Sequence, residues 1–127
     1  MKQKDIITAM QDWTPIDTYA NARRFKQYQK RYPRELASCL RNLADLVLLL
    51  RAAGSPLSVG AGFFRSEGRN VWRIGQTGVP AAHETRLYVY IHVSSHGLYV
   101  LTVGDKNTQR GDIAEAYKTA RRIENEL

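Results

Sequence analysis

Thr85-Arg86-Leu87-Tyr88-Val89-Tyr90-Ile91-His92-Val93 is the stretch that decides the fold predicted from the sequence. Its aliphatic residues recur at every second position, which is the period of a β-strand whose two faces meet different surroundings. One face would carry Leu87, Val89, Ile91 and Val93, and the other Arg86, Tyr88, Tyr90 and His92. The aliphatic face has to be covered by helices, so we expect the second face to be open to solvent.

Further strands are expected on both sides of this one. A hairpin turn over residues 94–97 leads to a strand over residues 98–104, which is apolar on both faces and is expected to be central in the sheet. A preceding strand covers residues 71–76 after the turn Gly68-Arg69-Asn70, and a weaker one covers residues 62–65. A loop over residues 77–84 connects to the decisive strand.

Helical patterns lie before and after the strands. Thr14-Pro15-Ile16-Asp17 has the form of a helix start, and this helix would run to Tyr32. Pro33 opens a second helix whose apolar stripe ends at the predicted C-cap Gly54. The two helices should pack antiparallel, and a last helix should follow from Thr108. The sequence therefore predicts one α+β domain over residues 1–127, with residues 1–13 as an N-terminal extension.

Composition narrows the class of protein. The chain has 127 residues and a formal net charge of +7, with a pI near 9.8. A basic domain attracts polyanions such as nucleic acid, an anionic membrane surface or an acidic protein. The single cysteine, Cys39, excludes an internal disulfide and is expected to be a buried apolar residue. No apolar run is long enough to span a bilayer and no secretory segment is evident, so a cytoplasmic location is expected.

The second face of the sheet carries the functional argument. Arg73 should share this face with the arginine, tyrosines and histidine of the decisive strand, and Lys106 leaves the next strand nearby. Guanidinium groups bind phosphates and tyrosine rings stack on unpaired bases, so this mixture is typical of nucleic-acid recognition. The alternative is an ordinary solvated face whose arginines balance nearby carboxylates.

The segment Gly104-Asp105-Lys106-Asn107-Thr108-Gln109-Arg110-Gly111-Asp112-Ile113-Ala114-Glu115-Ala116 resembles the GDK-x-x-Q-x-x-DI-x-x-A motif of RelE/HigB-type toxins. The stretches Trp72-Arg73-Ile74 and Arg86-Leu87-Tyr88-Val89-Tyr90 resemble that family's two arginine-bearing strands. The resemblance implies a RelE-like fold, with two antiparallel helices on a twisted, mainly antiparallel sheet and a C-terminal helix. The sequence departs from the family's pattern in three ways. Trp72 stands where an acidic residue is common, the loop over residues 77–84 is longer than usual, and the short first strand of the family is not evident.

The family resemblance implies a function as well as a fold. It implies the toxin of a toxin–antitoxin pair, a metal-independent endoribonuclease that cleaves mRNA on the ribosome and is neutralised by a cognate antitoxin. No cofactor is expected.

In such an enzyme the RNA 2′-hydroxyl attacks the adjacent phosphorus, and the catalyst holds the phosphate and moves two protons. Arg73 and Arg86 would hold the phosphate, Lys106 would stabilise the leaving oxygen, and Tyr88 would stack on a base or shuttle a proton. The expected RNA-contacting residues are Tyr90, His92, Arg65 and Gln109. Gln109 is also expected to satisfy backbone groups at the start of the last helix, and Asp105 to orient a strand arginine.

The sequence is also compatible with other functions. Asp112 is expected to interact with a helix dipole rather than with a metal, and His92 and His96 lack the spacing of a ligand set. A ParE-like inhibitor of DNA gyrase would share the fold, and a non-catalytic nucleic-acid-binding module would share the basic face. The expected partners are the antitoxin, mRNA and the ribosome, and no membrane.

Overall fold

The structure, a computed structural model, describes residues 13–80 and 82–127. Residues 1–12 of the predicted N-terminal extension therefore lie outside the described part. The elements follow the order β1 (Thr14–Ile16), α2 (Ala22–Arg31), α3 (Pro33–Ala53), η1 (Pro56–Ser58), β2 (Phe64–Gly68), β3 (Val71–Gly75), β4 (Thr85–His92), β5 (Gly97–Asp105) and α4 (Gln109–Glu126). The predicted α+β class is confirmed.

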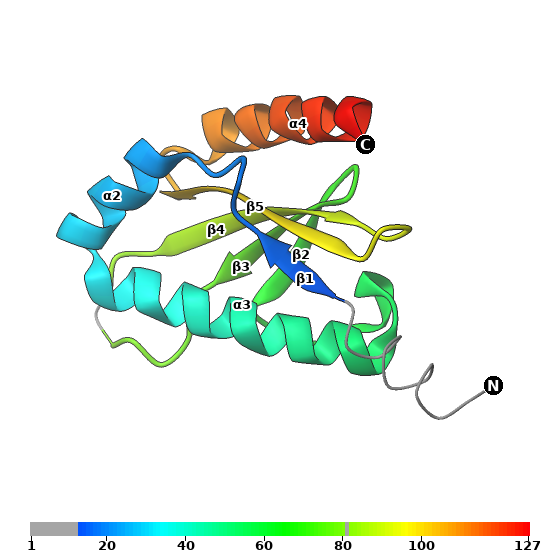
Figure 1. Ribbon diagram of the computed structural model, residues 1–127. Helices are drawn as coiled ribbons and strands as arrows, with labels where there is room; N and C mark the ends of the chain where they lie inside the picture. The colour runs from blue at the N-terminus through cyan, green and yellow to red at the C-terminus, as the bar shows by residue number, and fades with distance from the viewer. Residues whose placement is uncertain (1–12, 81) are drawn as a thin grey trace.

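A five-stranded sheet forms the middle layer, with the strand order β1-β5-β4-β3-β2. β1 pairs with β5 in parallel, and the other neighbours are antiparallel. Figure 1 shows α3 across one face of the sheet and α4 across the other. The strand predicted to be central, β5, lies between β1 and β4, while β4 is the middle strand of the five. Helices cover both faces of the sheet, and this explains why β5 is apolar on both of its faces.

α3 forms where its pattern predicted a helix. Pro33 occupies the first turn, and Gly54 ends the helix in the left-handed conformation with φ 77°. Cys39 is fully buried on this helix, as predicted, and burial raises the pKa of its thiol to about 12. Leu87, Val89 and Ile91 of β4 join Cys39 in the main core cluster. Val93 does not, because β4 ends at His92 and leaves Val93 exposed.

The predicted first helix is wrong over residues 14–17. Thr14–Ile16 is an edge strand, and the Thr14 N–H donates to the His96 carbonyl at 3.1 Å. Pairing with the free edge of β5 outweighs the local helix-start pattern, and an edge strand tolerates Pro15 because no N–H is required there. A short first strand, which was not evident in the sequence, is therefore present. Helix α2 starts later, where the Asn21 side chain accepts from the Arg24 N–H at 3.2 Å.

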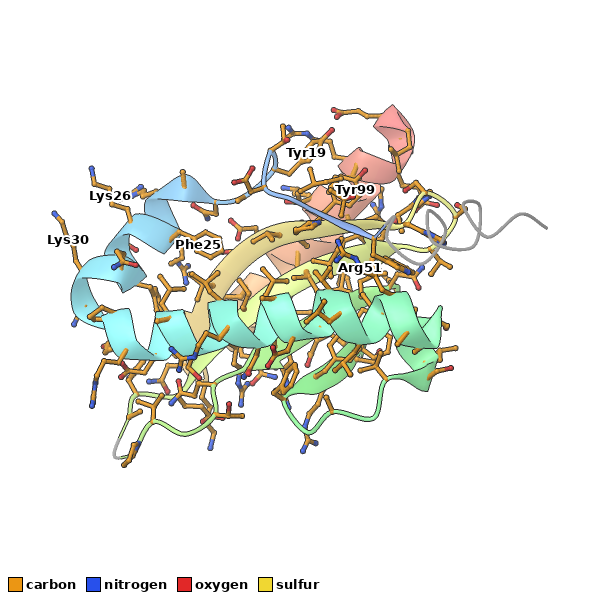
Figure 2. The ribbon with its side chains drawn as sticks, turned by 60° about the horizontal axis from the view of Figure 1, so that its bottom comes forward. Tyr19, Phe25, Lys26, Lys30, Arg51 and Tyr99 are labelled. Carbon is orange, nitrogen blue, oxygen red and sulfur yellow. The ribbon has the colours of Figure 1, made fainter. Side chains whose placement is uncertain are left out.

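α2 and α3 do not form the predicted antiparallel pair. α2 meets the start of α3 at a steep angle and lies over the end of β5 (Figure 1). Its Phe25 and Tyr28 pack into the core, whereas Lys26 and Lys30 point away from the protein (Figure 2). The Arg24 guanidinium donates to the Val103 carbonyl of β5 at 3.2 Å, which ties the helix to the sheet.

The second face of the sheet is covered, which contradicts the expectation of an open face. Ala116, Ala120 and Ile123 of α4 form a second core cluster with Tyr88 and Tyr90 of β4. Both tyrosines are buried. The alternation along β4 correctly separated two faces, but a tyrosine ring suits a buried face as well as an exposed one.

Candidate functional site

Three predicted arginines converge at one end of the sheet. Arg65 lies opposite Arg73 in the β2–β3 register, and Arg86 of β4 lies opposite Gly75 of β3. All three line a cavity of about 320 Å³ whose other lining residues are Gly62, Phe63, Gly75, Gln76, Thr77, Glu84 and Thr85. The register of β2, β3 and β4 thus gathers basic residues that are up to 21 positions apart in the chain.

Carboxylates partly neutralise these arginines. Arg86 Nη2 contacts Glu84 Oε1 at 3.0 Å, and Arg73 Nε contacts Glu67 Oε1 at 3.4 Å. The hydrogen bond from Arg86 and then its charge lower the pKa of Glu84, with further contributions from Lys106 and Arg73. The lining of the cavity therefore contains three arginines and one glutamate, and the excess positive charge favours an anionic ligand.

Arg86 is the most firmly positioned of these arginines. Its side chain is only 11% exposed, and its second terminal nitrogen, Nη1, donates to Oε1 of Gln109. Gln109 was expected to satisfy backbone groups at the helix start, but its side chain holds the arginine instead. A guanidinium fixed in this way keeps a geometry suited to a phosphate oxygen.

The remaining predicted site residues do not join the cavity. Tyr88 and Tyr90 lie beneath α4, so neither ring can stack on a base. Burial, and then the charge of Asp112, raise the pKa of Tyr88 to about 12, which disfavours proton transfer near neutral pH. His92 is at the opposite end of β4, where its Nδ1 lies 2.7 Å from Ser95 Oγ in the β4–β5 turn. Lys106 is exposed beside α4, in a shallow depression with Gln109 and Arg110.

A histidine–aspartate pair at the same end of the sheet was not predicted. His83 Nε2 lies 2.9 Å from Asp105 Oδ2, which also accepts from the Tyr28 hydroxyl at 2.9 Å. The His83 ring stacks on Tyr32 with centroids 3.9 Å apart. Asp105 therefore binds a histidine and a tyrosine rather than orienting a strand arginine. His83 stands in an irregular loop, where no periodic pattern could indicate its partner.

Part of the Gly-Asp-Lys motif is structural. Asp112 is 2% exposed and accepts from Thr108 Oγ1 at 2.6 Å, while Arg24 Nη1 lies 3.2 Å from its other oxygen. Burial raises the pKa of Asp112, although Thr108 and Arg24 act in the opposite direction. Asp112 lies in the first turn of α4, the place from which it was expected to interact with the helix dipole. Its contacts tie α4 to α2.

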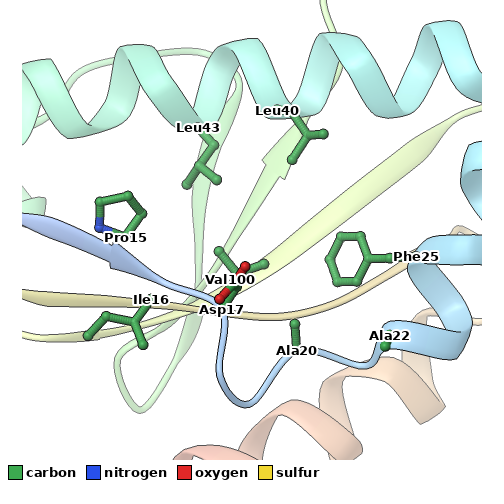
Figure 3. Close-up of a pocket in the computed structure, with 9 residues that line it drawn as sticks. All are labelled: Pro15, Ile16, Asp17, Ala20, Ala22, Phe25, Leu40, Leu43 and Val100. Carbon is green, nitrogen blue, oxygen red and sulfur yellow. The ribbon is translucent and has the colours of Figure 1, made fainter.

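A larger cavity of about 590 Å³ lies between β1, α2 and α3 (Figure 3). Its lining is mostly apolar and consists of Pro15, Ile16, Asp17, Ala20, Ala22, Phe25, Leu40, Leu43 and Val100. Such a surface suits an apolar side chain rather than a charged reactant. The arginine cavity is therefore the better candidate for chemistry on an anionic substrate.

Within residues 13–80 and 82–127, no group of three or more histidine, cysteine, aspartate or glutamate side chains could hold a metal ion. None of the described helices combines the length and apolar character that a membrane crossing requires. Comparisons of the chain with family models, curated proteins and solved structures found no match.

Proposed function

We propose that this protein is the toxin of a toxin–antitoxin pair and cleaves mRNA as an endoribonuclease. The observation that carries the proposal is the convergence of Arg65, Arg73 and Arg86 on one cavity. Lys106 is close enough for its charge to lower the pKa of Glu84, which pairs with Arg86. The resemblance of residues 104–116 to the RelE/HigB motif supports the same reading. We also propose a cytoplasmic location and a RelE-like fold.

The proposed chemistry is a transesterification within the RNA. The 2′-hydroxyl attacks the adjacent phosphorus, a cyclic phosphate forms, and the 5′-oxygen of the next nucleotide leaves and takes up a proton from water. Arg86 and Arg73 exchange their carboxylate partners for the phosphate oxygens and stabilise the added negative charge. Lys106 does not line the cavity, but its charge acts on Glu84, and from this position it stabilises the leaving oxygen. Glu84, whose side chain is 60% exposed, loses its pairing with Arg86 in this step and accepts the proton of the 2′-hydroxyl, because the main cause of its lowered pKa is then removed.

The buried tyrosines Tyr88 and Tyr90 have a structural role in this proposal. Tyr88 lies opposite Arg73 across the β3–β4 ladder and packs in the core cluster beneath α4. Tyr90 packs against α4 in the same cluster. Both residues position the strands, and base stacking is not assigned to them.

The test is cleavage of mRNA on translating ribosomes, mapped by primer extension, with Arg86→Ala beside the wild type. Loss of Arg86 should lower cleavage about 10²-fold or more, because a preorganised donor to the transition state is removed. Arg121→Ala, which changes an exposed arginine of α4, should cleave like the wild type. Equal cleavage by Arg86→Ala would refute the assignment of the site, and wild-type protein that leaves both free and ribosome-bound mRNA intact would refute the ribonuclease.

One observation favours a non-catalytic alternative. Arg73 and Arg86 both have carboxylate partners, and the aromatic residues of the same sheet face are buried. A nucleic-acid-binding module with this face would bind RNA with strong salt dependence and leave it intact. Growth arrest on expression with intact mRNA would instead point to a gyrase inhibitor. In each toxin reading, the expected antitoxin is an acidic or amphipathic segment that covers the arginine cavity.

A further inference from the structure

The outer face of α2 is strongly basic and lies away from the arginine cavity. The helix contains Arg23, Arg24, Lys26, Lys30 and Arg31 and no acidic residue. Arg24 pairs with Asp112, whereas Arg23, Lys26 and Lys30 form no ion pair with any other residue that the structure describes. Lys26 and Lys30 extend from the helix into solvent (Figure 2). The charge of this face is therefore available to an external partner.

The spacing of the basic residues produces a regular row. Arg23, Lys26 and Lys30 follow at intervals of three and four residues, so they share one face of the helix, with neighbouring Cβ atoms about 5–6 Å apart. Phe25 and Tyr28 occupy the opposite face and pack into the core. The cap at Asn21 and the bond from Arg24 to Val103 hold the helix in place. The row is thus presented on a rigid support.

The chemistry of this face distinguishes between classes of polyanion. It has no exposed aromatic ring, which proteins commonly use to stack on the bases of a single strand. It also has no exposed apolar stripe, which a helix needs in order to insert into a membrane surface. What remains is a regular row of cations, and this matches the regularly spaced phosphates of a double helix.

We propose that the outer face of α2 is a docking surface for the phosphate backbone of double-stranded RNA. The choice of RNA over DNA rests on the proposed ribonuclease function, which places the protein beside structured RNA. α2 contacts β5, while the arginine cavity is formed from β2, β3, β4 and the loop before β4. The protein thus has one surface that holds an RNA duplex and a separate cavity that acts on a single strand.

The test measures binding of the full-length protein to a short labelled RNA duplex over a series of salt concentrations. The variant Lys26→Gln/Lys30→Gln removes two charges from the row. Its matched control, Lys118→Gln/Arg121→Gln, removes two charges from exposed positions of α4. Near ~0.1 M salt, the α2 variant should bind the RNA duplex at least about tenfold more weakly than the wild type. The slope of log affinity against log salt concentration should decrease in magnitude by about two. The control should stay within about twofold of the wild type.

The outcomes separate this proposal from the proposed function. Cleavage of a short unstructured RNA should be unchanged in Lys26→Gln/Lys30→Gln, and Arg86→Ala should lose cleavage while keeping duplex binding. If the wild type cleaves no RNA but the α2 variant still loses duplex binding, the ribonuclease fails and the docking surface stands. Equal losses in both double variants would mean that only net charge matters and would overturn the proposal. Equal binding of single-stranded RNA or of a DNA duplex through α2 would overturn the assignment to double-stranded RNA.

Discussion

At Gly104, β5 passes directly under the first turn of α4. A Cβ atom added there would lie 1.7 Å from Asp112 Oδ2 and 2.6 Å from Thr108 Oγ1. The Thr108 hydroxyl donates a hydrogen bond to the Asp112 carboxylate, which also contacts Arg24. The glycine of the Gly-Asp-Lys motif is therefore required for the close approach of helix to strand, independently of any catalytic role.

Gly104→Ala should lower the free energy of unfolding by about 1–3 kcal/mol, because the methyl group forces the buried carboxylate to move. Gly111→Ala is the matched control, since its added Cβ meets nothing within 4 Å. That change lies in the first turns of α4 and should stabilise the protein by about 0.5–1 kcal/mol. Urea denaturation of both variants measures the difference, and equal stabilities would refute this account of Gly104.

Two buried tyrosine hydroxyls have opposite surroundings. The Tyr28 hydroxyl donates to Asp105 at 2.9 Å, whereas the Tyr88 hydroxyl forms no hydrogen bond of ordinary geometry with the residues the structure describes, although Arg86 is near enough to lower its pKa. A buried hydroxyl without a hydrogen-bond partner destabilises the folded state, whereas a hydrogen-bonded one stabilises it.

Tyr88→Phe should therefore leave the free energy of unfolding unchanged or raise it by up to about 1 kcal/mol. Tyr28→Phe should lower it by about 1–2 kcal/mol, because the bond to the carboxylate is lost. Denaturant titration compares the two variants. A larger loss in Tyr88→Phe than in Tyr28→Phe would mean that the Tyr88 hydroxyl is paired in solution.

At the scale of the element, β1 depends on the residue that precedes it. Trp13 is 1% exposed and its ring stacks on His96 with centroids 4.5 Å apart. It packs in the same core cluster as Leu46 and Leu50 of α3, and its carbonyl accepts from Arg51 at 3.3 Å. The short strand is thus held by a large anchor as well as by its pairing with β5.

Trp13→Ala should lower the free energy of unfolding by about 3–5 kcal/mol, because it leaves a large cavity beside α3. Trp72 provides the comparison, since it is only half-buried and stacks on Phe64 with centroids 4.4 Å apart. Trp72→Phe keeps an aromatic ring there and should cost less than about 1.5 kcal/mol. Thermal and denaturant unfolding measure both, and a small effect of Trp13→Ala would show that β1 does not depend on this anchor.

At the scale of the whole molecule, Asp105 connects segments that are distant in the chain. Its Oδ2 contacts His83 and Tyr28, and its Oδ1 accepts from the N–H groups of Asn107 and Thr108. Burial pushes the pKa of Asp105 upward, but these hydrogen bonds outweigh it and hold the pKa below the usual 3.8. Folding therefore favours the ionised form of this carboxyl group.

The sign of the pH dependence follows from this shift. The stabilisation by Asp105 is present above the unfolded pKa and is lost as the pH falls through the lower folded pKa. Asp105→Asn should lower the melting temperature at pH 7 and reduce the loss of stability below about pH 4. Asp112→Asn is the contrast, because the raised pKa of Asp112 predicts the opposite change with pH. Melting curves from pH 2 to pH 7 test both, and parallel curves for wild type and Asp105→Asn would contradict the prediction.

Much of the fold and part of the candidate site could be predicted from local pattern. The apolar stripe of α3, the alternation along β4 and the start of α4 depend on neighbouring residues, and the structure agrees with them. Arg65, Arg73 and Arg86 were predicted as site residues, and one cavity brings them together. Tyr88, Tyr90 and His92 were also predicted as site residues, but the structure places both tyrosines beneath α4 and His92 at the opposite end of β4. Residue type alone does not reveal whether a helix covers a tyrosine or at which end of a strand a site forms.

The sequence by itself determined the α+β class, the two faces of the decisive strand and the basic character of the chain, because periodicity and net charge are local or additive properties. Only the tertiary structure decided that residues 14–16 pair with β5, that α4 buries Tyr88 and Tyr90, and that Gln109 and Glu84 hold Arg86. These features arise from contacts between segments far apart in the chain. Their free energies depend on which surfaces meet, and this is settled only when the whole core packs together.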